Sequence, residues 1–222
     1  GIICAAHVFI VAHWGVAPFV ASLGVQLISY GLCLQYFNTV CNSNPLSGFT
    51  KTYSKFCQGT IRIGNISLSY LMFYAIAVVA VMWVIWNRTT LGRNMFAIGG
   101  NREAAKVCGV NVKRTIIIVY IIAGLLYAFG GVLEAGRTGS ANSTMGADYA
   151  MDAIAACVVG GVSMKGGTGT LPGVVIGVII FQIISYGLIY IGVSPDLQYV
   201  VKGLIIIVAV VLDNQKSLRK AA

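Results

Sequence analysis

The sequence predicts an all-α, polytopic membrane protein, and three observations support this prediction. Apolar residues make up 58% of the chain and charged residues only 9%, whereas soluble domains carry about 25% charged residues. The apolar residues form long continuous runs and not the alternating segments of a β-barrel. The charges gather at the ends of these runs, so the net charge of +9 reflects membrane orientation and does not indicate nucleic-acid binding.

Six apolar runs are predicted as full spans, at residues 18–37, 66–86, 115–134, 151–162, 171–191 and 199–212. A bilayer span needs about 20 apolar residues, so residues 1–12 form only a partial span. We interpret them as the end of a helix whose beginning is missing. Because residue 1 is Gly and not Met, we expect residues 1–222 to be the C-terminal part of a longer protein and to form a single transmembrane domain.

Residues 88–114 form a polar, basic loop between two long apolar runs, with Arg88 and Arg93 at one end and Lys113 and Arg114 at the other. Polytopic membrane proteins keep their positive loops in the cytoplasm. We therefore expect this segment, the docking loop, to face the cytoplasm together with the C-terminus, while most acidic residues fall on the outer side.

The middle of the docking loop has the features of a short helix that binds a partner. Asn101 can cap its start, Glu103 lies near the positive end of its dipole, and Gly109 supplies a stop. The small residues Ala104, Ala105 and Cys108 give this helix a face that fits closely into a groove. We expect Ala105→Trp or Gly109→Arg to uncouple the loop from its partner without unfolding the membrane part.

Two series of small residues are predicted to let helices pack closely. Such faces allow helix backbones to approach where no hydrophobic effect drives association. The two series are Gly169, Gly173 and Gly177, and Ala153, Cys157 and Gly161. Packing within one subunit is the plainer interpretation, and a role in subunit contact or in a translocation path is the alternative.

Polar residues near apolar runs are candidates for a solute path. Asp152 opens a short run, either as a first-turn anion or as a polar group at the outer mouth of a path. Gln182 and Tyr186 lie one turn apart and either line a path or hydrogen-bond between helices. Glu134 and Arg137 are three residues apart and can pair at the outer face.

Four segments of the chain carry a resemblance to a known family: LGRNMFAIGGNREAAKVCGVNV, YAFGGVLEAGRTGSA, DAIAACVVGGVSMKGGTGTLPGVVIG and GVSPDLQYVVKGLIIIVAVVLDNQK. Together they resemble the permease subunits of bacterial ABC importers for monosaccharides such as ribose, xylose, arabinose and galactose. The shorter segments FAIGGN, YGLIYIGV and PLSGF are most similar to the galactose and methyl-galactoside type. The resemblance covers essentially the whole chain.

The resemblance implies a multi-pass protein of the bacterial inner membrane with a cytoplasmic C-terminus, and it implies that the N-terminal part of the family fold is missing here. It further implies three protein partners: a second permease copy in a homodimer, a cytoplasmic ABC ATPase subunit, and a periplasmic sugar-binding protein. The family's coupling segment, which docks onto the ATPase, corresponds to Gly99, Gly100, Asn101, Glu103, Ala104, Ala105 and Gly109.

ATP hydrolysis is expected on the partner, so this chain is predicted to be no enzyme and to bind no cofactor itself. The glycine-rich stretch at residues 166–170 does not match G-x-x-x-x-G-K-[ST], because Lys165 precedes the glycines. His7 and His13 have no cysteine or carboxylate at ligand spacing, so no metal site is predicted.

The six cysteines form no C-x-x-C pair. Cys41 and Cys57 both fall in the predicted outer loop, where a bacterial periplasm is oxidising. The sequence leaves open whether these two thiols form a disulfide.

The leading prediction is the permease subunit of an ATP-driven monosaccharide importer of the galactose type. Within the family, a permease for ribose, a nucleoside or another small solute is the alternative. A secondary transporter driven by an ion gradient would need carboxylates or histidines deep in its spans, and all the full runs except 151–162 are expected to carry almost none. A non-transporting scaffold or sensor would leave the docking loop without a role.

Overall fold

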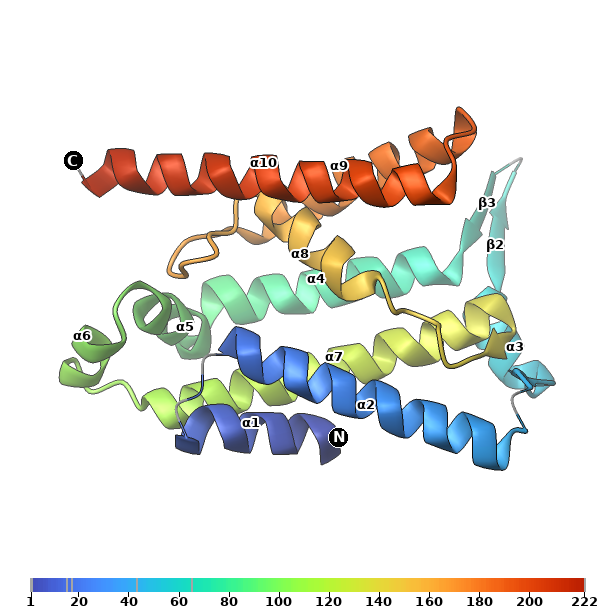
Figure 1. The fold of residues 1–222 in the computed structure, drawn as a ribbon, viewed down its shortest axis with the longest axis horizontal. Coiled ribbons are helices and arrows are strands. Elements are labelled where there is room, and N and C mark those ends of the chain that lie inside the picture. The colour runs from blue at the N-terminus through green and yellow to red at the C-terminus, as the bar shows by residue number, and fades with distance from the viewer. Residues whose placement is uncertain (1, 15, 17, 43, 65, 222) are drawn as a thin grey trace. The chain divides into compact units, whose positions relative to one another are not determined.

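The computed structural model describes residues 2–14, 16, 18–42, 44–64 and 66–221 of the chain. Helices make up most of this part, and its strands are short (Figure 1). Four of the described helices are long and apolar enough to cross a membrane. The prediction of an all-α, polytopic membrane fold is therefore confirmed.

The chain divides into two compact units, each built from two stretches of sequence. The first unit comprises Gly1–Val81 and Asn111–Met145, and the second comprises Met82–Val110 and Gly146–Ala222.

The first unit is organised around α7 (Val112–Thr138), the yellow-green helix of Figure 1. Helix α1 (Ile2–Trp14) packs along α7, and α2 (Pro18–Val40) packs on α1. Gly124 of α7 allows the close approach, since a Cβ added there would lie 2.9 Å from the Cβ of Cys4. The glycine thus lets the short helix α1 pack tightly against α7.

The predicted polar loop after α2 contains short elements that connect to α7. Strand β1 (Leu46–Ser47) pairs antiparallel with β4 (Ser140–Ala141), with Leu46 opposite Ala141. Helix α3 (Lys51–Gln58) packs against α7. These contacts hold the loop at the C-terminal end of α7.

The start predicted for the span at residues 66–86 is wrong by four residues. Strand β2 (Thr60–Ile63) pairs with β3 (Ile66–Ser69) in an antiparallel hairpin. Helix α4 (Tyr70–Arg88) therefore begins only at Tyr70. The apolar side chains of Ile66 and Leu68 extended the apolar run in the sequence, but an alternating pattern of this kind also suits a strand.

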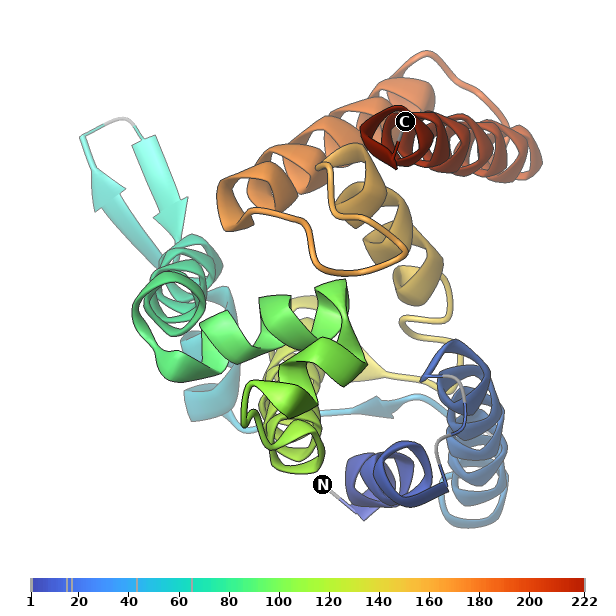
Figure 2. The same cartoon turned by 90° about the vertical axis from the view of Figure 1, so that its left-hand side faces the viewer.

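The second unit contains α5 (Thr90–Gly100), α6 (Arg102–Val107), α8 (Tyr149–Val159), α9 (Leu171–Tyr190) and α10 (Pro195–Ala221). Helices α8, α9 and α10 pack pairwise against one another (Figure 2). Their core consists of Ala155, Ala156 and Phe181, with Ile205 and Ile206 of α10 packed against it.

The predicted full span at residues 151–162 is not observed. Helix α8 has 11 residues, which corresponds to about 16 Å of helix, and the hydrocarbon core is about 30 Å thick. The helices that meet the length and composition of a span are Val20–Val40, Tyr70–Arg88, Val112–Thr138 and Leu171–Tyr190. The last predicted run, 199–212, lies within the 27 residues of α10, whose side chains after Val211 are outside the described part.

Glycines bring α8 and α9 into backbone contact. A Cβ added to Gly173 would lie 2.3 Å from the carbonyl oxygen of Gly160, and one added to Gly177 would lie 2.1 Å from that of Ala156. These distances leave no room for any side chain. The structure therefore places Gly173 and Gly177 at a helix contact within one chain, as the plainer interpretation expects.

The rest of the two predicted series is placed differently. Gly169 precedes α9, whose N-cap is Thr170. On α8, Ala156 and Gly160 make the contact with α9, while Ala153 is exposed and Gly161 follows the helix with a φ of +82°. Cys157 is only partly buried. Spacing by four residues identifies a helical face but not which face meets a neighbour, and residues 156 and 160 show this spacing too.

Replacing Gly177 by Ala is expected to destabilise the protein, because its Cβ would clash with the backbone of Ala156. Overpacking of this kind costs about 1–3 kcal/mol. Gly187→Ala is the matched control, since a Cβ at this position of the same helix meets nothing within 4 Å. Thermal unfolding in detergent should show a lower midpoint for Gly177→Ala only, and equal midpoints would contradict the contact.

Candidate functional site

The docking loop folds into two short helices, α5 and α6, which meet at Asn101. The backbone of Asn101 is extended, with φ −154° and ψ 108°, and its Oδ1 accepts hydrogen bonds at 3.0 Å from the backbone N–H groups of Glu103 and Ala104. The predicted N-cap is thus confirmed. Helix α5 was not predicted. Its own signal is Thr89, whose hydroxyl oxygen accepts a hydrogen bond from the backbone of Gly92.

Gly109 ends α6 in the way the sequence predicts. Its φ is +81°, a left-handed conformation that favours glycine. The N–H of Val110 donates to the carbonyl of Ala105, and the N–H of Gly109 donates to that of Lys106, both at 3.0 Å. These two bonds form a Schellman motif, so both ends of α6 are fixed by local hydrogen bonds.

The exposed surface of α6 differs from the predicted small-residue face. Ala104 is exposed, but Ala105 is only 4% exposed and is buried in the second unit. Successive helical residues point about 100° apart, so two adjacent alanines do not share one face. Ala105→Trp would therefore disturb internal packing, and it does not isolate the binding of a partner.

Val107 is the apolar side chain that α6 presents outward, with 90% of its surface exposed. Beside it, the ammonium of Lys106 donates to the Glu103 carboxylate at 2.8 Å. This hydrogen bond, together with the positive charge of Lys106, lowers the pKa of Glu103. A single valine at the end of a short polar helix is a weak sequence signal, and the sequence reasoning missed it.

The other end of the docking loop contacts the chain itself. Gly99, near the end of α5, lies against the loop that joins α8 to α9 (residues 160–170, the α8–α9 loop; Figure 2). A Cβ added to Gly99 would lie 2.6 Å from the backbone nitrogen of Gly167, and one added to Gly167 would lie 2.7 Å from the Cα of Gly100. The structure thus places Gly99 and Gly100 at an internal backbone contact.

A charged pair joins α8 to α10. The Nζ of Lys202 lies 2.9 Å from both carboxylate oxygens of Asp152, and the two side chains are 20% and 22% exposed. Lys202 also lies over the ring of Phe181, 5.8 Å from its centroid. One ammonium of α10 therefore contacts both α8 and α9.

A second polar link lies next to this pair. The hydroxyl of Tyr199 donates to a carboxylate oxygen of Asp148 at 2.8 Å. Asp148 is the N-cap of α8 but makes no side-chain capping bond, so its carboxylate serves the link to α10. Asp152 lies in the first turn of α8, which agrees with the helix-anion interpretation, and its ion pair adds a tertiary role.

Lys202 is a charged residue inside an apolar run that the sequence reasoning did not single out. It lies inside the apolar run at residues 199–212, 50 residues away from its partner Asp152. Ionisable residues in apolar helices are functional candidates and usually pair with one another. Gln182 and Tyr186, in contrast, are both exposed on α9.

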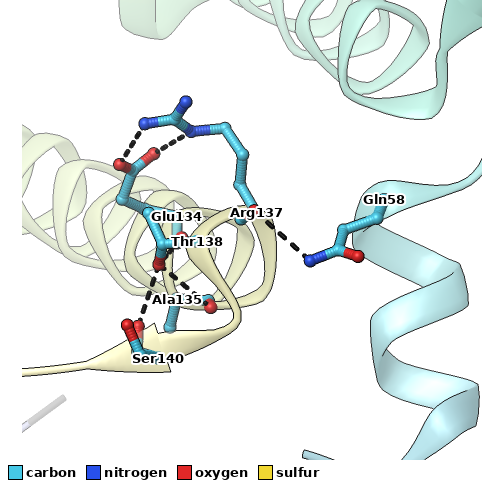
Figure 3. A network of polar contacts seen from close by, with 6 residues as sticks. All are labelled: Gln58, Glu134, Ala135, Arg137, Thr138 and Ser140. Atoms are coloured by element: carbon cyan, nitrogen blue, oxygen red, sulfur yellow. Dashed lines mark hydrogen bonds and ion pairs between the residues drawn. The ribbon is translucent and has the colours of Figure 1, made fainter. Parts of the chain in front are cut away.

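The predicted pair of Glu134 and Arg137 is confirmed at the C-terminal end of α7 (Figure 3). The guanidinium donates to both carboxylate oxygens, at 2.9 and 2.7 Å. From α3, the amide of Gln58 donates to the backbone carbonyls of Gly136 and Arg137. The hydroxyl of Thr138 lies 2.9 Å from the carbonyl of Ser140 at the start of β4. The end of α7 is thus fixed to its neighbours.

Cys41 and Cys57 are both free thiols in the structure. Cys57 on α3 is fully buried, and a Cβ added to Gly136 would lie 2.5 Å from its Cβ. The hydroxyl of Tyr53 donates to the carbonyl of Val132. These contacts give Cys57 a packing role between α3 and α7.

An open groove of about 740 Å³ lies in the first unit, with Phe49 and Tyr53 on one side and Gly131, Val132 and Ala135 of α7 on the other. The two aromatic rings meet edge to face at 5.1 Å. The lining carries no charged side chain, so the groove offers shape and apolar contact but no reactive group.

Metal-binding clusters are absent from the described residues, where no three His, Cys, Asp or Glu side chains come together. His7 lies on α1 against the ring of Tyr120. The side chain of His13 lies outside the described residues.

The comparisons with known proteins agree on one kind of relative. The profile of the family described as "Branched-chain amino acid transport system / permease component" matches residues 1–210. The chain is 54% identical over 211 residues to the galactose/methyl galactoside import permease protein MglC of Escherichia coli (strain K12), which covers 95% of this chain and 62% of that protein.

More distant relatives include a permease named for another sugar. The chain is 41% identical over 218 residues to the MglC protein of Treponema pallidum (strain Nichols), covering 96% of this chain and 40% of that one. It is 38% identical over 201 residues to the ribose import permease protein RbsC of Bacillus subtilis (strain 168), covering 90% and 61%. The chain thus spans less than two thirds of each of these relatives. No solved structure matches it.

Removing the Asp152 carboxylate with Asp152→Ala is expected to lower the unfolding free energy by about 2 kcal/mol, because the Lys202 ammonium loses its partner. Lys202→Met combined with Asp152→Ala should recover part of this loss, since no unpaired charge remains. Glu103→Gln, which breaks an exposed pair, is the control and should change little. Thermal unfolding of all variants in detergent tests the pair, and additive effects of the two substitutions would contradict the coupling.

Proposed function

The chain belongs to the permease-component family whose profile covers residues 1–210, and from this premise we propose that it is the permease subunit of an ATP-driven ABC importer. Its solute is a monosaccharide of the galactose type, and it works in the bacterial inner membrane. The solute assignment is supported by identities of 54% to a relative named for galactose and 38% to one named for ribose.

The observation that carries the coupling part of this proposal is the geometry of α6. This helix is fixed at both ends, by Asn101 and by Gly109, and presents Val107 with 90% of its surface exposed. A rigid helix with an outward apolar side chain suits a groove on a partner. Basic residues flank the docking loop, which is typical of a cytoplasmic segment. We therefore assign α6 to the contact with the ATPase subunit.

Hydrolysis of ATP belongs to that partner, because no phosphate-loop motif occurs in this sequence. In the proposed cycle, two permease copies form the path and the ATPase subunits move their docking loops as they close on ATP. A periplasmic binding protein delivers the sugar to the outer face, where we place α3 and the pair of Glu134 and Arg137. Sugar specificity then rests largely on the binding protein.

The candidates for the path itself lie in the second unit. Gln182 and Tyr186 are exposed on α9, and their polar groups can line a route for a hydroxylated solute. Asp152 is already held by Lys202, so we assign this pair to the outer mouth of the path, where it also fixes α8. A permease needs only weak contacts of this kind, because tight binding would slow release.

Co-expression with the ATPase encoded beside its gene tests the coupling contact. The permease is expected to co-purify with the ATPase in detergent, and Val107→Asp should reduce co-purification roughly tenfold, because a carboxylate would enter an apolar contact. Ile61→Asp, at another exposed apolar residue on β2, is the control and should bind normally.

Normal binding by Val107→Asp would contradict the role of α6. Failure of the unaltered permease to bind any ATPase would reject the ABC assignment and favour an ion-driven transporter or a non-transporting scaffold.

Solute competition tests the galactose assignment. Uptake of radiolabelled galactose by proteoliposomes that contain the complete importer should be suppressed by unlabelled methyl galactoside and unaffected by the same concentration of ribose. Suppression by ribose, or by a nucleoside, without suppression by methyl galactoside would assign the permease to another solute of the same family.

A further inference from the structure

At Gly99, Gly166 and Gly167, α5 and the α8–α9 loop meet backbone to backbone. A Cβ added to Gly99 would lie 2.6 Å from the nitrogen of Gly167, and one added to Gly166 would lie 2.8 Å from the carbonyl oxygen of Gly99. Heavy atoms in ordinary contact are about 3.5–4.0 Å apart. No side chain therefore fits between the two segments at these glycines. The two backbones touch directly there.

The α8–α9 loop is held in a defined shape on its side of this contact. The N–H of Ser163 donates to the carbonyl of Thr168, and the N–H of Gly166 donates to that of Ser163, both at 3.1 Å. Gly166 and Gly167 have φ values of +93° and +73°. The loop shape and the contact thus impose the same requirement for glycine at these two positions.

The loop leads directly into a tightly packed helix pair. Thr170 at its end caps α9, with its hydroxyl oxygen accepting a hydrogen bond from the N–H of Gly173. Gly173 and Gly177 in turn touch the backbone of α8. Close-packed backbones transmit displacement with little compression. A movement of α5 therefore reaches α8 and α9 through one continuous set of backbone contacts.

We propose that the contact of Gly99 with Gly166 and Gly167 is the link through which the docking loop positions α8 and α9 during transport. The three glycines are positioning residues that touch neither the ATPase nor the solute. This inference rests on the proposed function, because it assigns a route to the movement that an ATPase would impose on α6. It locates that route inside the chain, one helix away from the surface that docks.

Gly99→Ala and Gly187→Ala form a matched pair for the test. Both are helical glycines of the second unit, but a Cβ at position 187 meets nothing within 4 Å. A Cβ at position 99 must push the loop away by about 1 Å to reach ordinary contact. The complete importer, with its ATPase and binding protein, is reconstituted in liposomes, and galactose transported per ATP hydrolysed is measured together with the thermal midpoint.

Gly99→Ala is expected to retain ATPase co-purification and to transport at least fivefold less galactose per ATP, while Gly187→Ala matches the unaltered protein. A tight but purely structural contact would lower the thermal midpoint without changing the galactose-to-ATP ratio, and this result would overturn the proposal. Loss of ATPase co-purification in Gly99→Ala would overturn it as well, since the residue would then act in docking. If the proposed function itself is wrong, the unaltered protein will already fail to bind the ATPase or to transport galactose. That outcome is therefore distinguishable from a failure of the proposed link.

Hydrogen–deuterium exchange of the unaltered importer gives a second test that needs no substitution. Binding of a non-hydrolysable ATP analogue to the ATPase should change exchange at the backbone amides of Ser163 and Gly166 at least twofold. The β2–β3 hairpin is the internal control and should not respond. Unchanged exchange in the α8–α9 loop would overturn the link.

Discussion

Direct contact between helix backbones is the constraint on which the second unit depends. Apolar helices in lipid gain little from burying apolar side chains against each other, so association relies on close packing and polar contacts. At Gly173 and Gly177 an added Cβ would meet the α8 backbone at 2.3 and 2.1 Å, which brings the two helices as close as their backbones allow. The same device, at Gly99 and Gly167, joins the docking loop to this helix pair.

Features fixed by neighbouring residues could be predicted from the sequence. Asn101 starts α6 and Gly109 ends it because capping depends on a few adjacent backbone groups. The Glu134–Arg137 pair lies within one helical turn and was predicted for the same reason. The apolar runs indicated the membrane class because composition alone separates lipid-exposed helices from soluble ones.

Features that depend on distant residues could not be predicted. The direction of Ala105, buried where an outward face was expected, is set by how the second unit packs around α6. Lys202 and Asp152 lie 50 residues apart, and nothing local to either one marks the other as its partner. The shortness of α8 was missed although its cause is local, since Gly161 with a φ of +82° ends the helix.

The ion pair between α8 and α10 has a consequence for how the protein is made. A lysine inside an apolar helix adds a cost to placing that helix in the bilayer, so α10 gains from a partner that is already in place. Its partner Asp152 is synthesised first and is already present when Lys202 emerges from the ribosome. The helices would therefore assemble in order. Helices α8 and α9 would pack together first, and α10 would then pack against them. The final helix would become stably inserted only in a chain whose preceding pair has already assembled.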